Sequence, residues 1–253
     1  GLELEVGWLP PLLDTARNPK LRPGSRGLLE AALSLDQVLE VPQGSLDRSH
    51  GDVHPFGNPH ILMDPRNGLR IARGIADRLS ELDPDGADTY AANYDAFAEL
   101  VDEFDAEVRE ALDSVPEEQR KLVTYHDAYA YFADTYGWTV VGAIQPADFG
   151  EPTPAEVIDL IEQVREEDVP AIFGSEVFPS PVLEQVGNET GATYIDVLRD
   201  DDLPGEPGEV EHSWLGLMKF NFITMVEALG GDADALREFE VRNVVPDEAE
   251  YPQ

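Results

Sequence analysis

Two of the chain's five histidines, His54 and His60, lie in one short stretch, residues 51–65, which reads GDVHPFGNPHILMDP. A neutral imidazole nitrogen is a preferred ligand of borderline divalent ions, above all Zn²⁺. The chain contains no cysteine, so thiolate metal sites and disulfides are excluded. His60 could equally be a solvated histidine in a turn rich in proline and glycine. The stretch therefore indicates a metal site only if other ligands lie near it.

Three further polar residues each stand at the end of a strand-like segment: His126 in KLVTYH, Glu176 in PAIFGSE and Asp196 in TYIDVL. Ligands of parallel α/β sheets bind outside the carboxyl ends of the strands, so these side chains could line one rim. Each also has a plainer interpretation. His126 and Asp196 could cap the helix or turn that follows, and Glu176 could be a solvated loop acid. His60, His126 and Asp196 together would supply two imidazoles and a carboxylate, a set of ligands that suits zinc.

Alternating helix and strand patterns must position these residues. Apolar residues at three- and four-residue spacings predict a helix over 65–82, with Asp64 as its N-cap and Pro65 in its first turn. A second, unusually long helix is predicted over about 86–113. The predicted strands are 121–126, 138–144, 170–176 and 193–198. Strands that alternate with helices predict an α/β fold with a parallel sheet covered on both faces.

The charge of the chain is strongly acidic. It has 52 Asp and Glu against 17 Lys and Arg, a formal net charge of -35, within 253 residues of which 42% are hydrophobic. Such a field disfavours nucleic acid and anionic membranes as partners and attracts cations. Because molar salt screens this self-repulsion, the composition indicates adaptation to high salt. No apolar run is long enough to span a membrane.

Motifs of the common enzyme classes are missing: the sequence has no HExxH, no GxSxG and no Walker-type phosphate loop. The remaining chemistry-bearing residues are metal ligands, which favours binding over catalysis. The main alternative is a zinc hydrolase with His60, His126 and Asp196 as ligands, water in the fourth position and Glu176 as general base.

Five segments follow one another along residues 1 to about 230. They are GLELEVGWLPPLLDTA, NPHILMDP, VTYHDAYAYFADTYGW, AIFGSEVFPSPVLEQVGNETGATYIDVL and HSWLGLMKFNFITMVEAL. In type and order they resemble segments of the zinc- and manganese-specific solute-binding receptors of ABC transporters, the group called cluster A-I. Any one of these motifs is weak, but five in register are fairly specific.

The resemblance implies an α/β receptor of two lobes, each a small parallel β-sheet flanked by helices, joined by one long rigid linker helix. The lobes would be residues 1–84 and 116–253, and the linker residues 85–115. The metal would lie between the lobes. By the same resemblance, its ligands would be His60 from the first lobe and His126 with Asp196 from the second.

The fourth ligand is left open by the resemblance. The family's first histidine precedes the segment with which this chain begins, so the first lobe is expected to be incomplete. The first residue is Gly1 and not Met, from which we expect either that a leader was removed or that the chain is a fragment. His54 and His50 are the nearest spare imidazoles. We predict that His54 belongs to a metal-collecting loop, because Pro55 and Pro59 stiffen the spacer between it and His60. Glu176 matches a position beside the metal that does not usually bind it.

The expected function is that of an extracytoplasmic, monomeric, non-enzymatic receptor that captures Zn²⁺ and presents it to an ABC permease. Mn²⁺ is the alternative ion. The family's manganese members tend to carry a carboxylate where this chain has His126, which favours zinc. A cell-adhesion or metal-storage protein on the same fold is a further alternative, and it would hold many ions weakly instead of one tightly.

Overall fold

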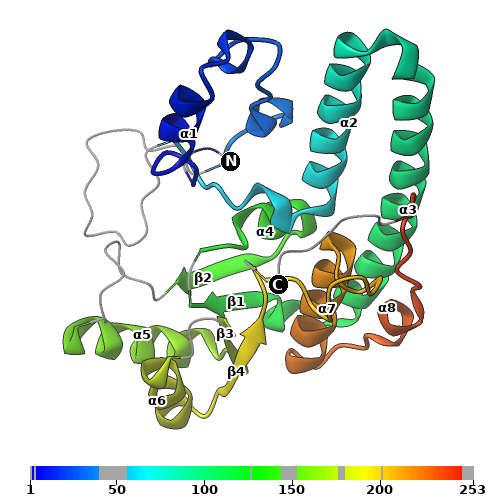
Figure 1. Ribbon diagram of the computed structural model, residues 1–253. Helices are drawn as coiled ribbons and strands as arrows, with labels where there is room; N and C mark the ends of the chain where they lie inside the picture. Colours follow the sequence, from blue (N-terminus) through cyan, green and yellow to red (C-terminus); the bar gives the residue numbers. More distant parts are fainter. Residues whose placement is uncertain are drawn as a thin grey trace. The chain divides into compact units, whose positions relative to one another are not determined.

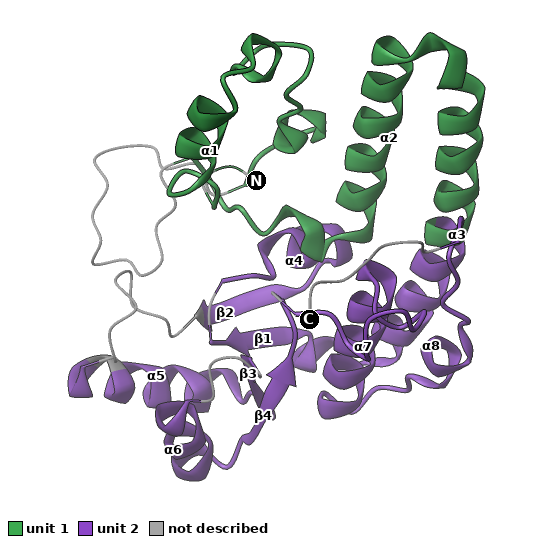
Figure 2. Ribbon diagram, in the orientation of Figure 1, with its two compact units in different colours: residues 1–46, 53–101 green, residues 47–52, 102–253 purple. Residues whose placement is uncertain are grey.

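The computed structural model describes residues 2, 4–39, 56–125, 127–143, 153–175, 180–200 and 202–246 of the chain (Figure 1). The chain divides into two compact units: unit 1 contains residues 1–46 and 53–101, and unit 2 contains residues 47–52 and 102–253 (Figure 2). None of the helices within the described ranges is both long enough and apolar enough to cross a membrane.

The regular elements in the described part of unit 1 are all helical. Its helices are α1 (Leu9–Ala16), α2 (Pro65–Leu82) and the first part of α3 (Ala87–Ser114), with 3₁₀ turns at Pro19–Leu21, Ala31–Ser34, Ile61–Met63 and Pro84–Gly86. The structure contains no strand among residues 4–39 and 56–101. The parallel sheet predicted for the first lobe is therefore not found in its described part.

Helix α2 confirms the sequence prediction at both ends. The Asp64 carboxylate accepts a hydrogen bond from the Arg66 N–H at 2.8 Å, and Pro65 occupies the first turn, where a missing N–H costs nothing. Helix α3, predicted at about 86–113, runs for 28 residues and crosses the division between the units. Because α2 starts directly after the turn that holds His60, its N-terminus anchors that turn.

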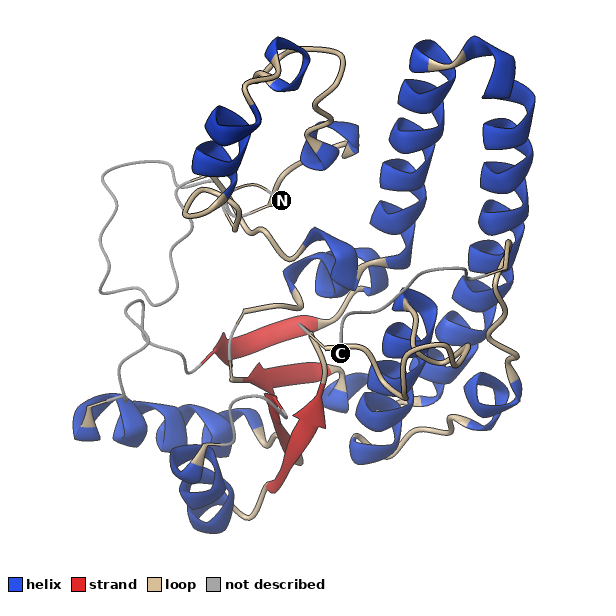
Figure 3. Ribbon diagram, viewed as in Figure 1, coloured by secondary structure: helices blue, strands red, loops and turns tan. Residues whose placement is uncertain are grey.

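Unit 2 contains a four-stranded sheet whose paired neighbours are all parallel (Figure 3). Its strands, in the order β2-β1-β3-β4, are β1 (Lys121–Thr124), β2 (Thr139–Ala143), β3 (Ala171–Ser175) and β4 (Thr193–Leu198). Its helices after α3 are α4 (Ala130–Tyr136), α5 (Pro154–Glu167), α6 (Pro181–Thr190), α7 (Trp214–Ala228) and α8 (Asp234–Glu238). The predicted α/β class and parallel sheet are confirmed.

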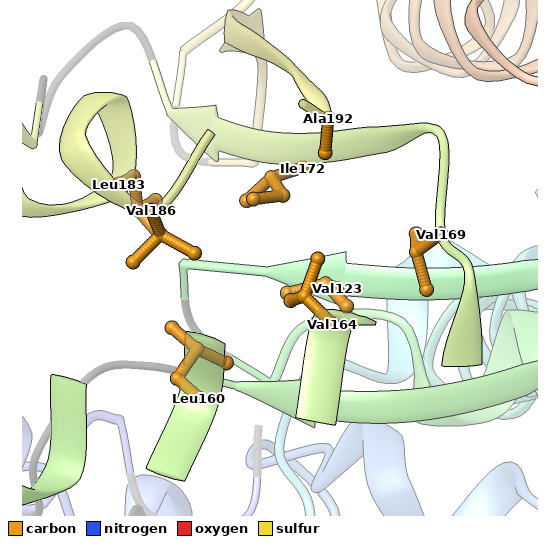
Figure 4. Packing of buried hydrophobic residues seen from close by; sticks show 8 residues of the cluster. All are labelled: Val123, Leu160, Val164, Val169, Ile172, Leu183, Val186 and Ala192. Carbon is orange, nitrogen blue, oxygen red and sulfur yellow. The ribbon is translucent and has the colours of Figure 1, made fainter. Parts of the chain in front are cut away.

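Two apolar clusters pack the elements of unit 2 together. A valine-rich cluster joins β1 and β3 to α5 and α6 (Figure 4); its labelled members are Val123, Leu160, Val164, Val169, Ile172, Leu183, Val186 and Ala192. An aromatic cluster joins Phe104 of α3, Phe132 of α4 and Phe222 of α7, each of them buried. Every residue of β3 is buried, as expected of a strand covered on both faces.

Candidate metal centre

The connections of the sheet define where a ligand should bind. From β1 the chain leads to β2 at one edge, and from β2 it returns past β1 to β3 and then β4. Strands β1 and β3 are therefore the neighbours at which the strand order reverses, and a crevice is expected outside their carboxyl ends. A hollow lies there, lined by Thr124, Tyr125, Tyr129, Phe173, Gly174, Ser175, Leu198 and Asp200.

Two of the predicted site residues, His126 and Glu176, lie outside the described residues. The residues that precede them in the chain, Tyr125 and Ser175, both line the hollow. The strand ends on which the prediction was based thus lie at one rim, although the histidine and glutamate side chains themselves are not part of the description.

Asp196 lies at an irregularity of β4. Ile195 pairs with Phe173 and Leu198 pairs with Ser175, so β4 has one residue more than β3 between these pairs. Such a bulge breaks the alternation of side chains and can redirect one of them; bulges are common beside binding sites. Asp196 is exposed.

Tyr194 packs across the neighbouring strand close to Asp196. An added Cβ on Gly174 would lie 2.6 Å from the Tyr194 hydroxyl oxygen, so a larger residue there would require the ring to shift. That hydroxyl accepts a hydrogen bond from the Ser180 N–H at 3.0 Å. Burial raises the pKa of Tyr194, and the negative charge of Asp196 adds to the rise. The Tyr194 phenol is therefore a neutral group beside the Asp196 carboxylate.

Asp200 is a rim residue that the sequence analysis did not single out. It lines the hollow, and its Oδ1 lies 3.4 Å from the buried Ser175 hydroxyl at the end of β3. In the sequence it belongs to the acidic run RDDD, which is indistinguishable from a solvated surface segment. Only its position directly after a strand could have identified it.

Asn221 of α7 holds the chain between Asp196 and Asp200. Its buried side chain accepts from the Arg199 N–H at 2.9 Å and donates to the Arg199 carbonyl at 2.5 Å, as a neighbouring strand would. It also donates to the Tyr129 hydroxyl at 3.3 Å, which lines the hollow. One amide on α7 thus ties the end of β4 to the segment that follows β1.

His60 belongs to unit 1, in the turn before α2. Its Nδ1 lies 3.0 Å from Asn58 Oδ1, and its backbone N–H donates to the same oxygen at 2.9 Å. The ring is half-buried. His50 and His54 lie outside the described residues, so their predicted roles stay predictions.

Within the parts of the chain that the structure describes, no three His, Asp or Glu side chains converge in a group that could hold a metal ion. Two of the three predicted ligands, His60 and Asp196, are described, and they belong to different units. The candidate metal-binding groups among the described residues are oxygen donors at the rim of unit 2 and an oriented imidazole in unit 1.

Comparison with known proteins identifies the family. Residues 1–228 match the family ZnuA, zinc-uptake complex component A, periplasmic. The chain is 35% identical to the iron-binding protein YfeA of Yersinia pestis over 71% of its length and 58% of the relative's. It is 31% identical to the manganese-binding lipoprotein MntA of Halalkalibacterium halodurans over 68% of the chain and 57% of MntA. It thus spans less than two thirds of either relative.

A solved structure shows the same architecture. The periplasmic zinc-binding protein TroA of Treponema pallidum superimposes with a TM-score of 0.69 at 25% identity, covering 90% of this chain and 78% of TroA. The family match includes all three predicted ligands, and the names of the three relatives refer to iron, manganese and zinc. With its parallel sheet and the rim at the ends of β1, β3 and β4, the chain belongs to the ZnuA family of periplasmic metal-binding proteins.

Proposed function

We propose that the protein is an extracytoplasmic receptor that captures a divalent transition-metal ion and delivers it to an ABC permease. The observation that carries the proposal is the family match over residues 1–228, which spans His60, His126 and Asp196. Relatives named as lipoproteins and periplasmic binding proteins support the location. The family is described as a component of a zinc-uptake complex and these relatives are named as metal-binding proteins, which favours a receptor over the zinc hydrolase considered from the sequence.

Zinc is the ion we propose, with manganese as the alternative. Relatives named for iron, manganese and zinc occur side by side, so the name of a relative does not decide the metal. The choice is supported by the proposed ligands themselves, because two imidazoles and one carboxylate suit Zn²⁺ better than the harder Mn²⁺. Water, His54 or another side chain would complete the coordination.

Elemental analysis of protein purified without added metal tests this function. We expect one tightly held zinc per chain, and in competition titrations a higher affinity for zinc than for manganese. Stoichiometric manganese or iron that zinc does not displace would overturn the choice of ion. The proposed receptor function would still stand. Many weakly held ions with no tight one would instead indicate a storage protein, and no binding at all would contradict the receptor.

The charge of the chain leads to a prediction about salt. A formal net charge of -35 opposes the compact state, and the Debye length falls from about 10 Å at 0.1 M salt to about 3 Å at 1 M. We therefore expect the melting temperature to rise steeply from low to molar salt, measured by circular dichroism.

A charge-reduced variant serves as the control. Asp159, Glu162 and Glu166 are exposed on α5, and changing all three to their amides removes three negative charges from one helix. This variant should melt higher than the wild type at low salt and gain less from added salt. Equal salt responses of the two proteins, or no response at all, would contradict adaptation to high salt.

A further inference from the structure

Asn58 is placed to act on the imidazole of His60. It is fully buried, and its backbone N–H donates to the Leu39 carbonyl at 2.9 Å, which anchors the residue inside unit 1. Its Oδ1 accepts from the His60 N–H at 2.9 Å and lies 3.0 Å from His60 Nδ1. One side-chain oxygen therefore faces both the backbone and the ring of the same histidine.

The two contacts together determine which ring nitrogen carries the proton. A backbone N–H can only donate, so the Asn58 atom that faces it must be the oxygen and not the amide nitrogen. Since that oxygen has no hydrogen to give, His60 Nδ1 must be the donor in the second contact. In the neutral ring the lone pair then belongs to Nε2, the nitrogen that can bind a metal ion.

Backbone hydrogen bonds also hold the turn that contains His60. The Ile61 N–H donates to the Pro59 carbonyl at 2.8 Å across His60, whose φ of -78° and ψ of 47° are close to an inverse γ-turn. The His60 carbonyl accepts from the Met63 N–H at 3.3 Å. Backbone and ring are thus fixed before any ion arrives, which reduces the entropy lost on binding.

We infer that Asn58 is a positioning residue for metal capture: it holds His60 in the tautomer and orientation that present Nε2 to the ion. The inference rests on the proposed role of His60 as a metal ligand. A partner of this kind typically contributes ten- to a hundredfold to metal affinity. Because Asn58 is a neutral amide, it orients the ring without adding a charge of its own.

Zinc titrations against a competing chelator test the inference. Asn58→Leu removes the oxygen while it keeps the number and branching of the side-chain heavy atoms, and it should weaken zinc binding by about ten- to a hundredfold. Asn58→Asp keeps an acceptor oxygen at the same place and should stay within about tenfold of the wild type. Asn67→Leu, the same change at another buried asparagine of unit 1, is the matched control and should leave zinc affinity unchanged.

A double-mutant cycle separates positioning from a general loss of structure. In the His60→Ala background, Asn58→Leu should cost no further affinity, because the ring on which it acts is gone. If it costs as much there as in the wild type, Asn58 is merely structural and the inference is wrong. If His60→Ala weakens zinc while Asn58→Leu does not, the inference alone fails. If His60→Ala has full affinity, both the assignment of His60 as a ligand and the inference about Asn58 fail.

Nuclear magnetic resonance reads the tautomer directly. With ¹⁵N-labelled histidine, two-bond proton–nitrogen spectra of the zinc-loaded protein should show His60 protonated at Nδ1 and metal-bound at Nε2. Asn58→Asp should keep this pattern, and Asn58→Leu should lose it. A wild-type spectrum with zinc on Nδ1 would overturn the inference, because that nitrogen could not then donate to Asn58.

Discussion

Replacing His60, His126 or Asp196 singly with alanine is expected to weaken zinc binding by more than about a hundredfold. Each change would remove a direct ligand, and the loss should exceed the ten- to hundredfold typical of a residue that only supports a ligand. Chelator competition with each purified variant measures the effect. His212→Ala is the matched control, because its Nδ1 lies 3.2 Å from the Pro204 carbonyl and the residue is not among the proposed ligands.

Two further variants test the residues proposed around these ligands. Glu176→Ala should stay within the roughly ten- to hundredfold range, since we propose that Glu176 lies beside the metal without binding it. His54→Ala should change the equilibrium affinity little if His54 belongs to a collecting loop, and as much as His60→Ala if it is the fourth ligand. Wild-type affinity in both His60→Ala and His126→Ala would refute the proposed site.

Phe222→Ala should lower the free energy of unfolding by about 3–5 kcal/mol. Phe222 is fully buried, and its ring centroid lies 5.2 Å from that of Phe132 and 6.1 Å from that of Phe104. Alanine would leave a cavity where α3, α4 and α7 meet, next to Asn221. Urea denaturation followed by circular dichroism at fixed salt measures the change.

Phe56→Ala is the control for this loss. Its side chain is 60% exposed, so the same change of atoms should shift the free energy of unfolding by no more than about 0.5 kcal/mol. If both variants unfold alike, the aromatic cluster contributes less to the stability of unit 2 than its burial indicates.

Local structure was largely predictable from the sequence. Helix α2 has the predicted bounds, with Asp64 as its cap, and β4 spans the predicted residues 193–198. The described residues of the other three strands lie inside their predicted ranges, with two residues fewer in each. Caps and periodicity depend on residues a few positions apart, so a linear pattern contains the information they need.

The position of the hollow in unit 2 was partly predictable. The rule that ligands bind at the carboxyl ends of parallel strands predicted the ends of β1, β3 and β4, and the hollow lies there. The rule cannot say which acid of the run RDDD faces the hollow. Asp200 was missed for that reason, since its contact with Ser175 joins residues 25 positions apart.

The tertiary structure alone decided how the rim residues are held. The bulge at Asp196 arises from pairing with β3, and nothing in the letters TYIDVL marks one residue as extra. The two hydrogen bonds between the Asn221 side chain and the Arg199 backbone join residues 22 positions apart. In the sequence, α7 looks like an ordinary apolar helix, and nothing in it indicates this contact. The sequence by itself therefore determined the elements, the charge and the residue types that can bind a metal. The strand order and the direction of each side chain depend on contacts between distant segments, which form only when the sheet and its covering helices assemble.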